Sequence, residues 1–216
     1  MTVSTMLSLL SEGFVTSLLI FVLTLLFSMP LGLAVMFGRR SRLTPLRGFI
    51  KAYISIMRGT PLMLQLMVVF YGPKLLLGVT VPGNWRFTAV IVAFVINYAA
   101  YFAEIYRSGI QSIPAGQREA ATVMGYSRSQ TFFRILFPQM VKRVMPPVTN
   151  EVITLVKDTS LAFALAYTEM FTMAKQIAAS QASLMPLFVA GVFYYIFNFV
   201  VATVMEQIEK KLDYYR

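Results

Sequence analysis

Lys157 and Asp158 are charged residues inside an apolar run that extends from Val148 to Met170. A charged side chain is costly to bury in a membrane, and it normally faces a cavity, a ligand or another charge. A zwitterionic solute carries both charges, so Lys157 could bind its carboxylate and Asp158 its ammonium group or a cationic side chain. Adjacent residues point about 100° apart on a helix, so the two cannot easily pair with each other. The alternative is a structural role: a buried Lys157–Asp158 pair, a bond from one of them to the backbone of a broken helix, or pairing within a dimer.

Neutral polar residues could complete a binding site around these charges. Thr159 and Ser160 follow directly, and Asn97 lies at a similar depth in another apolar run. Gln65, in a further run, could either form a hydrogen bond between helices or line a solute path. The candidate binding residues therefore come from three separate segments.

Glu104 is expected to have a structural partner. It lies three residues before Arg107, and residues at this spacing are neighbours on a helix. We therefore predict an ion pair between them, with a contact to a cationic solute as the alternative. Arg58, at the end of another run, is expected either to extend toward the membrane surface or to pair with a neighbouring acid.

Missing residue types exclude several kinds of chemistry. The chain has no cysteine and no histidine, which excludes disulfides, thiolate or imidazole metal sites, and catalysis by either residue. Its nine acidic residues are scattered. The phosphate-binding pattern G-x-x-x-x-G-K-[ST] does not occur, so ATP is not bound in that way. We expect no catalytic site, no metal site and no cofactor on this chain.

The composition predicts an integral membrane protein. Of 216 residues, 57% are hydrophobic and 13% are charged, whereas soluble domains contain about 25% charged residues. The net charge of +10 could suggest nucleic acid, but in a membrane protein a basic excess more often marks cytoplasmic loops. We therefore expect a lipid bilayer, and no nucleic acid, as the partner of this surface.

Apolar runs predict five membrane-spanning helices, since a span needs about 20 mostly apolar residues. The runs cover residues 13–37, 60–77, 87–106, 148–170 and 184–205. The predicted fold class is all-α, with one transmembrane domain over residues 1–216. Pro61 is expected to kink the second helix, which could begin near Phe49.

The basic residues predict the orientation, because cytoplasmic loops carry an excess of lysine and arginine. One side of the predicted spans has Lys74, Arg86 and Lys175. The other side has Arg39, Arg40, Arg42, Arg47, Lys51, Arg58, Arg107, Arg118, Arg128, Arg134, Lys142, Arg143, Lys210, Lys211 and Arg216. The N-terminus is therefore expected outside and the C-terminus in the cytoplasm.

Residues 112–138 form a polar segment between the third and fourth predicted spans. Pro114 fits the first turn of a helix, and Glu119 lies in the N-terminal half, where the helix dipole favours a carboxylate. Ala120 and Ala121 are small enough for another surface to approach the backbone. Gly125 should interrupt the helix.

A second short helix is predicted directly after Gly125. The sequence from Ser127 to Gln130 has the pattern of a capping box. Phe133, Leu136 and Phe137 recur at helical spacing and are expected to anchor this helix on the spans, and Pro138 is expected to stop it. The segment should be a helix–turn–helix on the cytoplasmic face.

The spacing of Glu119-Ala120-Ala121, Gly125 and Ile135-x-x-Pro138 resembles the EAA loop of the membrane subunits of bacterial ABC importers. In that family the loop forms a coupling helix that docks in a groove of the ATPase subunit. Phe137 departs from the usual leucine. Three further segments are similar to the polar amino-acid branch, the histidine, glutamine, arginine and opine permeases: residues 58–65, 97–104 and 157–161.

This resemblance implies a permease subunit of a type I importer in the bacterial cytoplasmic (inner) membrane. It also implies three partners: a second permease subunit in a homodimer or heterodimer, an ABC ATPase dimer that carries ATP and Mg, and an extracytoplasmic amino-acid-binding protein. Glu119, Ala120, Ala121 and Gly125 would contact the ATPase.

Two other function classes stay open at this stage. An ion-coupled secondary transporter or channel would need no ATPase, but it leaves the Glu119 pattern unexplained. An intramembrane enzyme would need clustered acids or nucleophiles at the membrane face, and the acids here are scattered. Which amino acid would be carried is not encoded in any single residue.

Overall fold

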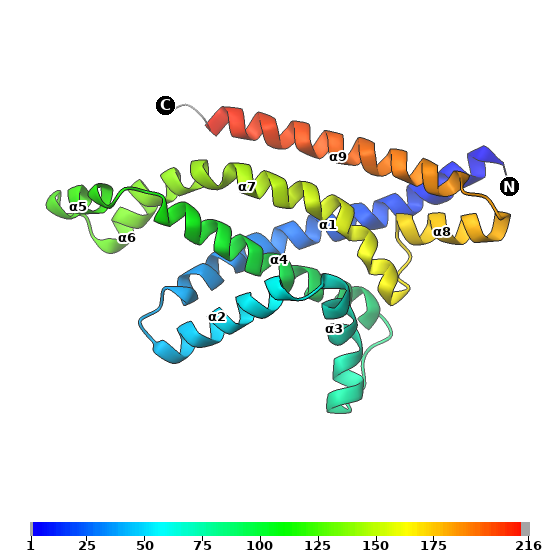
Figure 1. The fold of residues 1–216 in the computed structure, drawn as a ribbon, viewed down its shortest axis with the longest axis horizontal. Coiled ribbons are helices and arrows are strands. Elements are labelled where there is room, and N and C mark those ends of the chain that lie inside the picture. The colour runs from blue at the N-terminus through cyan, green and yellow to red at the C-terminus, as the bar shows by residue number, and fades with distance from the viewer. Residues whose placement is uncertain (1, 213–216) are drawn as a thin grey trace.

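The computed structural model describes residues 2–212, and over that range the chain is built from helices without strands. Arg216, counted above among the cytoplasmic cations, lies outside the described residues. Figure 1 shows long helices lying side by side, with the short α5 and α6 at one end. The elements are α1 (Val3–Arg39), α2 (Thr44–Gly59), α3 (Leu62–Leu77), α4 (Trp85–Gln111), α5 (Ala115–Val123), α6 (Arg128–Gln130), the π-helix η1 (Thr131–Leu136), α7 (Phe137–Asp158), the 3-10 helix η2 (Thr159–Leu165), α8 (Met170–Gln181) and α9 (Met185–Leu212).

Three helices of the described chain, α1, α4 and α9, are long and apolar enough to cross a membrane. The pair α2 and α3 is a fourth candidate, bent by 115° at its break. Pro61 begins α3 as its N-cap, and proline cannot continue the hydrogen bonding of a preceding helix. The expected interruption at Pro61 is confirmed, as a sharp bend between two helices. The count of five spans stays a prediction.

The fourth predicted span differs from the helix that forms. A continuous helix over residues 148–170 is not found, because α7 begins at Phe137 and ends at Asp158. The chain continues as η2, which ends at Leu165 and is followed by Ala166 with a left-handed φ of 49°. Lys157 and Asp158 therefore lie at a helix end, where the backbone changes geometry, and not in the middle of a regular span.

Small residues let α1 and α4 approach closely. A Cβ placed on Gly32 would lie 2.8 Å from Cβ of Phe102 and 3.0 Å from the carbonyl oxygen of Ala99. Ser28 and Thr24, one and two turns earlier on α1, are fully buried. Close backbone packing through small residues is the usual way in which membrane helices associate. This crossing forms the centre of the core.

A buried carboxylate joins α1, α8 and α9. Glu169 is the N-cap of α8 and accepts hydrogen bonds from the backbone N–H groups of Phe171 and Thr172, each at 2.7 Å. Ser17 of α1 and Tyr194 of α9 also donate to it, at 3.4 and 3.1 Å. Capping uses the unpaired N–H groups of the first turn, so this acid is paired although it is fully buried.

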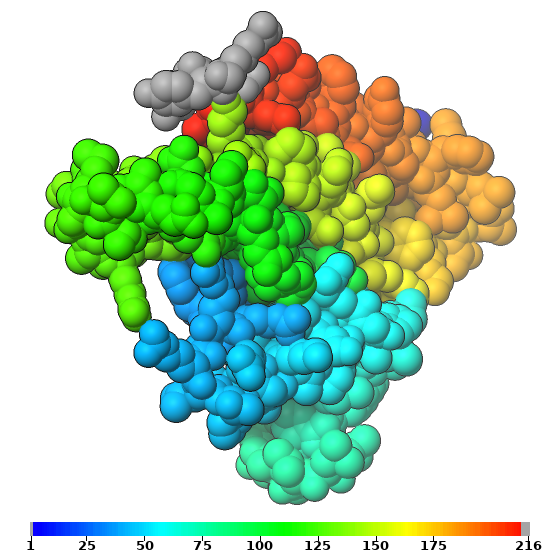
Figure 2. All heavy atoms as spheres, turned by 60° about the vertical axis from the view of Figure 1, so that its left-hand side comes forward, coloured from blue at the N-terminus to red at the C-terminus, as the bar shows by residue number. Residues whose placement is uncertain are grey.

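Figure 2 looks toward the end of the molecule that carries α5 and α6. There the green surface of α4 and α5 stands next to the blue surface formed by the end of α1 and the start of α2. The predicted loop and most of the basic residues before Lys51 therefore share one end of the fold.

Candidate functional site

The segment of residues 112–138 begins with the helix–turn–helix predicted from its capping signals. Pro114 precedes α5 as its N-cap, and Gly125 follows it with φ +78°. A left-handed φ strains any residue with a Cβ, so glycine is suited to this turn. Ser127 and Gln130 form both hydrogen bonds of a capping box, at 3.3 and 2.8 Å. The interruption at Gly125 and the second helix start are confirmed.

The two faces of α5 differ in their surroundings. Ala121 is 1% exposed, and α5 packs against η1, so a partner could not contact Ala121 without displacing other groups. Glu119 and Ala120 are exposed. Val123 and Met124, at the end of the helix, are 88% and 73% exposed. The segment therefore presents one acid, one small residue and two apolar side chains outward.

The second helix does not end as predicted. Pro138 occupies the first turn of α7, where its missing N–H is tolerated, so the chain passes from η1 into α7 without a stop. Leu136 is buried as expected, but Phe133 is 61% exposed. The ring of Phe132 contacts Phe37 of α1 instead, with centroids 5.0 Å apart. The π-helical turn shifts which side chains face the spans. Phe132 therefore makes the contact that α-helical spacing predicted for Phe133.

Gln65 and Asn97 lie together at the break between α2 and α3. The amide nitrogen of Asn97 donates to the Gln65 side-chain oxygen at 2.9 Å and to the Met57 carbonyl at 3.1 Å. Gln65 donates to the carbonyls of Met57 and Thr60, each at 3.0 Å. A helix end leaves carbonyls without partners, and these two amides satisfy them. This geometry favours the bond between helices that was one of the two roles open for Gln65.

Asp158 contacts a different face of α4 from the one that carries Asn97. The Tyr98 hydroxyl donates to its carboxylate at 2.7 Å. Lys157 is exposed. Thr159 and Ser160 donate to the carbonyls of Val156 and Lys157, each at 2.8 Å.

The candidate binding residues are therefore divided between two separate groups. Asn97 and Tyr98 are adjacent on α4, yet Asn97 bonds toward the α2–α3 break and Tyr98 toward α7. The structure brings Asn97 and Gln65 together, and it brings Asp158 to Tyr98. It does not bring these two groups, or Lys157, into one cluster of hydrogen bonds.

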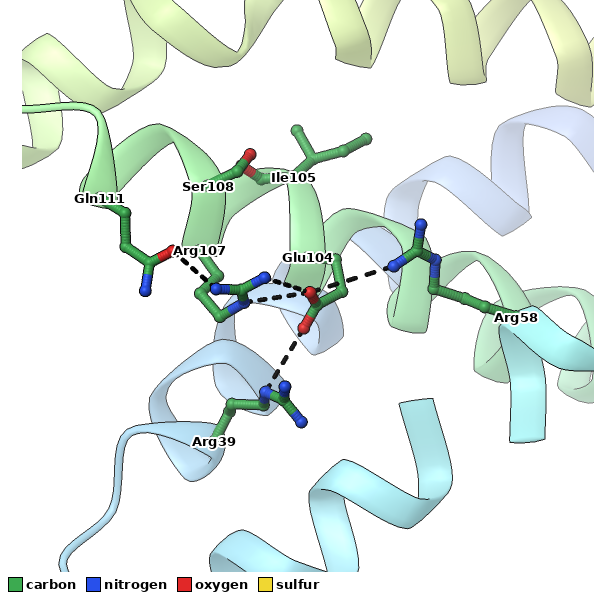
Figure 3. Close-up of polar contacts among 7 residues, drawn as sticks. All are labelled: Arg39, Arg58, Glu104, Ile105, Arg107, Ser108 and Gln111. Carbon is green, nitrogen blue, oxygen red and sulfur yellow. Dashed lines mark hydrogen bonds and ion pairs between the residues drawn. The ribbon is translucent and has the colours of Figure 1, made fainter. Parts of the chain in front are cut away.

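Glu104 is surrounded by three arginines from different helices (Figure 3). Arg107 lies 2.6 Å from its carboxylate, which confirms the predicted i,i+3 pair. Arg39 of α1 lies at 3.4 Å, and Arg58 of α2 lies at 4.0 Å, so Arg58 pairs with a neighbouring acid. Three guanidinium groups already face this carboxylate, which favours its structural role over contact with a solute.

Some buried polar residues were not anticipated from the sequence. Glu169 lies inside the apolar run 148–170, and the signal that could have identified it is an acid that precedes a helix by one residue. Its partners Ser17 and Tyr194 are far away in sequence and gave no signal. Among the residues that the structure describes, no group of acidic side chains is arranged to hold a metal ion.

Comparison with known sequences identifies relatives over nearly the whole chain. The profile of a family described as binding-protein-dependent transport system inner membrane component matches residues 28–214. The L-cystine transport system permease protein TcyB of Bacillus subtilis (strain 168) is 36% identical over 209 residues, covering 95% of this chain and 87% of the relative. The arginine transport system permease protein ArtQ of the same organism is 35% identical over 202 residues, covering 93% and 91%.

Solved structures share the fold. A chain in the crystal structure of an amino acid ABC transporter with histidines has a TM-score of 0.87 and 26% identity, covering 98% of this chain and 100% of that one. A chain of the inward-facing MetNI methionine ABC transporter has a TM-score of 0.78 at 19% identity, covering 98% and 99%, and it supports the fold alone. With the family profile matching residues 28–214 and relatives at 35% identity or more, the chain belongs to the binding-protein-dependent transport system inner membrane component family.

Proposed function

We propose that this chain is the membrane-spanning permease subunit of an ATP-driven amino-acid importer. It would form the translocation pathway with a second permease subunit and couple to a separate ATPase dimer through α5. The observation that carries the proposal is the exposed outer face of α5, on which Glu119 and Ala120 stand beside Val123 and Met124. The cystine and arginine permeases among the relatives support the class of cargo.

The exposed apolar residues of α5 support docking by a soluble partner. Val123 and Met124 are among the most exposed large apolar side chains of the described chain. They lie on a short helix at the end of the molecule rather than on a long apolar helix (Figure 1). Contiguous apolar side chains that water would otherwise surround mark an interaction surface. Since the chain has no phosphate-binding loop, the ATP and Mg would be bound by that partner.

The proposal also includes the membrane topology of the chain and its location in the cell. The chain would cross the bacterial inner membrane five times, with its N-terminus outside and its C-terminus in the cytoplasm. This orientation places α5 and the basic residues near Arg39 on the cytoplasmic side, in agreement with the positive-inside rule. An extracytoplasmic binding protein would deliver the amino acid to the opposite face.

Asp158 remains the proposed contact for a cationic or zwitterionic cargo, because it is a half-buried carboxylate at the irregular end of α7. Asp158→Ala should raise the KM for uptake about tenfold or more, as expected for loss of a charged hydrogen bond. Transport assays in proteoliposomes would measure it. Tyr98→Phe is the matched control, because it removes the donor to Asp158 and keeps the carboxylate. A wild-type KM in Asp158→Ala, with the ATPase still bound, would move the cargo site elsewhere.

The function itself is tested by reconstitution. The chain, co-expressed with its candidate ATPase and binding protein, is expected to take up a labelled amino acid only when ATP is enclosed on the ATPase side. Uptake should be insensitive to collapse of ion gradients. Uptake driven by an ion gradient after ATP depletion, by the chain without an ATPase, would instead establish a secondary transporter and overturn the proposal.

A further inference from the structure

A basic pocket of about 900 Å³ lies where the end of α1 and the start of α2 meet the end of α4 and the start of α5. Figure 2 shows this end of the molecule, with the blue and green surfaces facing each other. No acidic residue lines the pocket. The charged residues that line it are Arg39, Arg40, Arg47, Lys51, Arg107 and Arg118.

Most of this charge has no opposite charge beside it among residues 2–212. Glu104, which does not itself line the pocket, pairs with Arg39 and Arg107. The other four basic residues, Arg40, Arg47, Lys51 and Arg118, have no carboxylate within salt-bridge distance among residues 2–212. A concentration of like charge in a concave site attracts an anion.

Arg118 gives a second, independent sign of a missing partner. Its Nε atom is buried and has no hydrogen-bond partner in the described structure, and its guanidinium reaches only the Ile110 carbonyl, at 3.5 Å. A buried donor without a partner is destabilising. Partial burial, together with the charge of Arg118, also lowers the pKa of Arg40 below its ordinary value. Both effects would be relieved by an anion between the two guanidinium groups.

The helix α2 indicates what kind of molecule carries the anion. Arg47 and Lys51 stand one turn apart and line the pocket. Beside them Leu43, Leu46 and Phe49, spaced three residues apart, are 66%, 40% and 72% exposed. An inorganic phosphate would leave these apolar residues uncovered. A phospholipid would place its phosphate in the pocket and its acyl chains on the apolar residues.

We propose that this pocket binds the headgroup phosphate of an anionic phospholipid, held by Arg40, Arg47, Lys51 and Arg118. The site lies at the end of the apolar helices α1 and α4, where a membrane-spanning chain meets the headgroup layer. The inference requires the chain to span a bilayer, but it does not depend on the cargo or on the ATPase. Its test is therefore a binding measurement and not a transport assay.

The test is native mass spectrometry of the purified full-length chain titrated with phosphatidylglycerol, phosphatidylcholine or inorganic phosphate. Wild-type protein should retain phosphatidylglycerol in preference to the other two. Arg47→Gln/Lys51→Gln should weaken that binding about tenfold or more. Each basic residue near anionic lipid raises the affinity roughly five- to tenfold. Arg118→Gln, a single change inside the pocket, should weaken it as well.

The matched control is Arg128→Gln/Arg134→Gln, which removes the same charge from exposed positions that do not line the pocket. This pair should change phosphatidylglycerol binding less than about twofold. Equal losses in both double variants would show general charge attraction and overturn the site. Displacement of phosphatidylglycerol by inorganic phosphate would overturn it in favour of a free anion. Loss of a co-purified ATPase, with lipid binding unchanged, would overturn it in favour of a protein contact.

Discussion

Reversing the charge of Glu119 should abolish ATP-driven amino-acid uptake while the chain still inserts into the membrane. Glu119 is exposed and has no hydrogen bond or ion pair among the described residues. The fold therefore loses no contact in Glu119→Lys beyond a small dipole effect. A lysine would place the wrong charge at the proposed ATPase interface, where desolvated like or unpaired charges are strongly unfavourable. Uptake and co-purification of the ATPase would be measured in parallel.

The control for Glu119→Lys is the same charge reversal at another exposed acid. Glu12 lies on α1, far from α5 in sequence, and is also exposed. Glu12→Lys should leave uptake near wild type. Gly125→Asp is a second test, since a Cβ at Gly125 would meet no atom of the chain within 4 Å, although φ +78° adds some strain. Normal uptake in Glu119→Lys or in Gly125→Asp would contradict docking through this segment.

Gly32→Val should prevent the native crossing of α1 and α4. The added Cβ alone would lie 2.8 Å from Cβ of Phe102 and 3.0 Å from a backbone oxygen. Neither atom is the mobile end of a side chain, so the helices would have to move apart. Overpacking of a filled core costs about 1–3 kcal/mol, and the close approach of two long helices places this change at the upper end. Thermal unfolding of the detergent-solubilised protein, followed by size-exclusion chromatography, would show a lower midpoint.

Gly191→Val is the matched control for this prediction. Gly191 is also inside a helix, α9, and a Cβ there would meet nothing within 4 Å. Both changes have the same effect on helix propensity and on polarity. A similar loss of thermal stability in the two variants would indicate that propensity and not the crossing is responsible, and it would refute the role of Gly32.

Features that depend on near neighbours in sequence could be predicted. The capping box from Ser127 to Gln130, the turn at Gly125 and the break at Pro61 each depend on residues within a few positions. The same holds for Glu104 and Arg107, which are neighbours on one helix. In each case the local geometry of a helix or its end determines the outcome, so tertiary packing does not alter it.

Features that depend on tertiary packing could not be predicted. Asn97 was expected in one layer with Asp158, but the rotation of α4 turns it toward Gln65 and presents Tyr98 to Asp158. Nothing in the spacing of α4 determines which neighbour meets which face. Pro138 was expected to end a helix, yet it fits the first turn of the next one. A proline signals a boundary without saying on which side of it the helix lies.

The hydrogen bonds to Glu169 hold three helices in a fixed arrangement relative to one another. Its carboxylate takes donors from Ser17 on α1, from the first turn of α8 and from Tyr194 on α9. Separating any of these helices would leave a buried carboxylate short of donors, which is far more costly than breaking one neutral bond. These three helices should therefore move together as one rigid body in any conformational change of the chain. Along the chain, α8 is reached through the junction where α7 gives way to η2 and Ala166 takes a left-handed φ of 49°, so we expect the backbone to bend there.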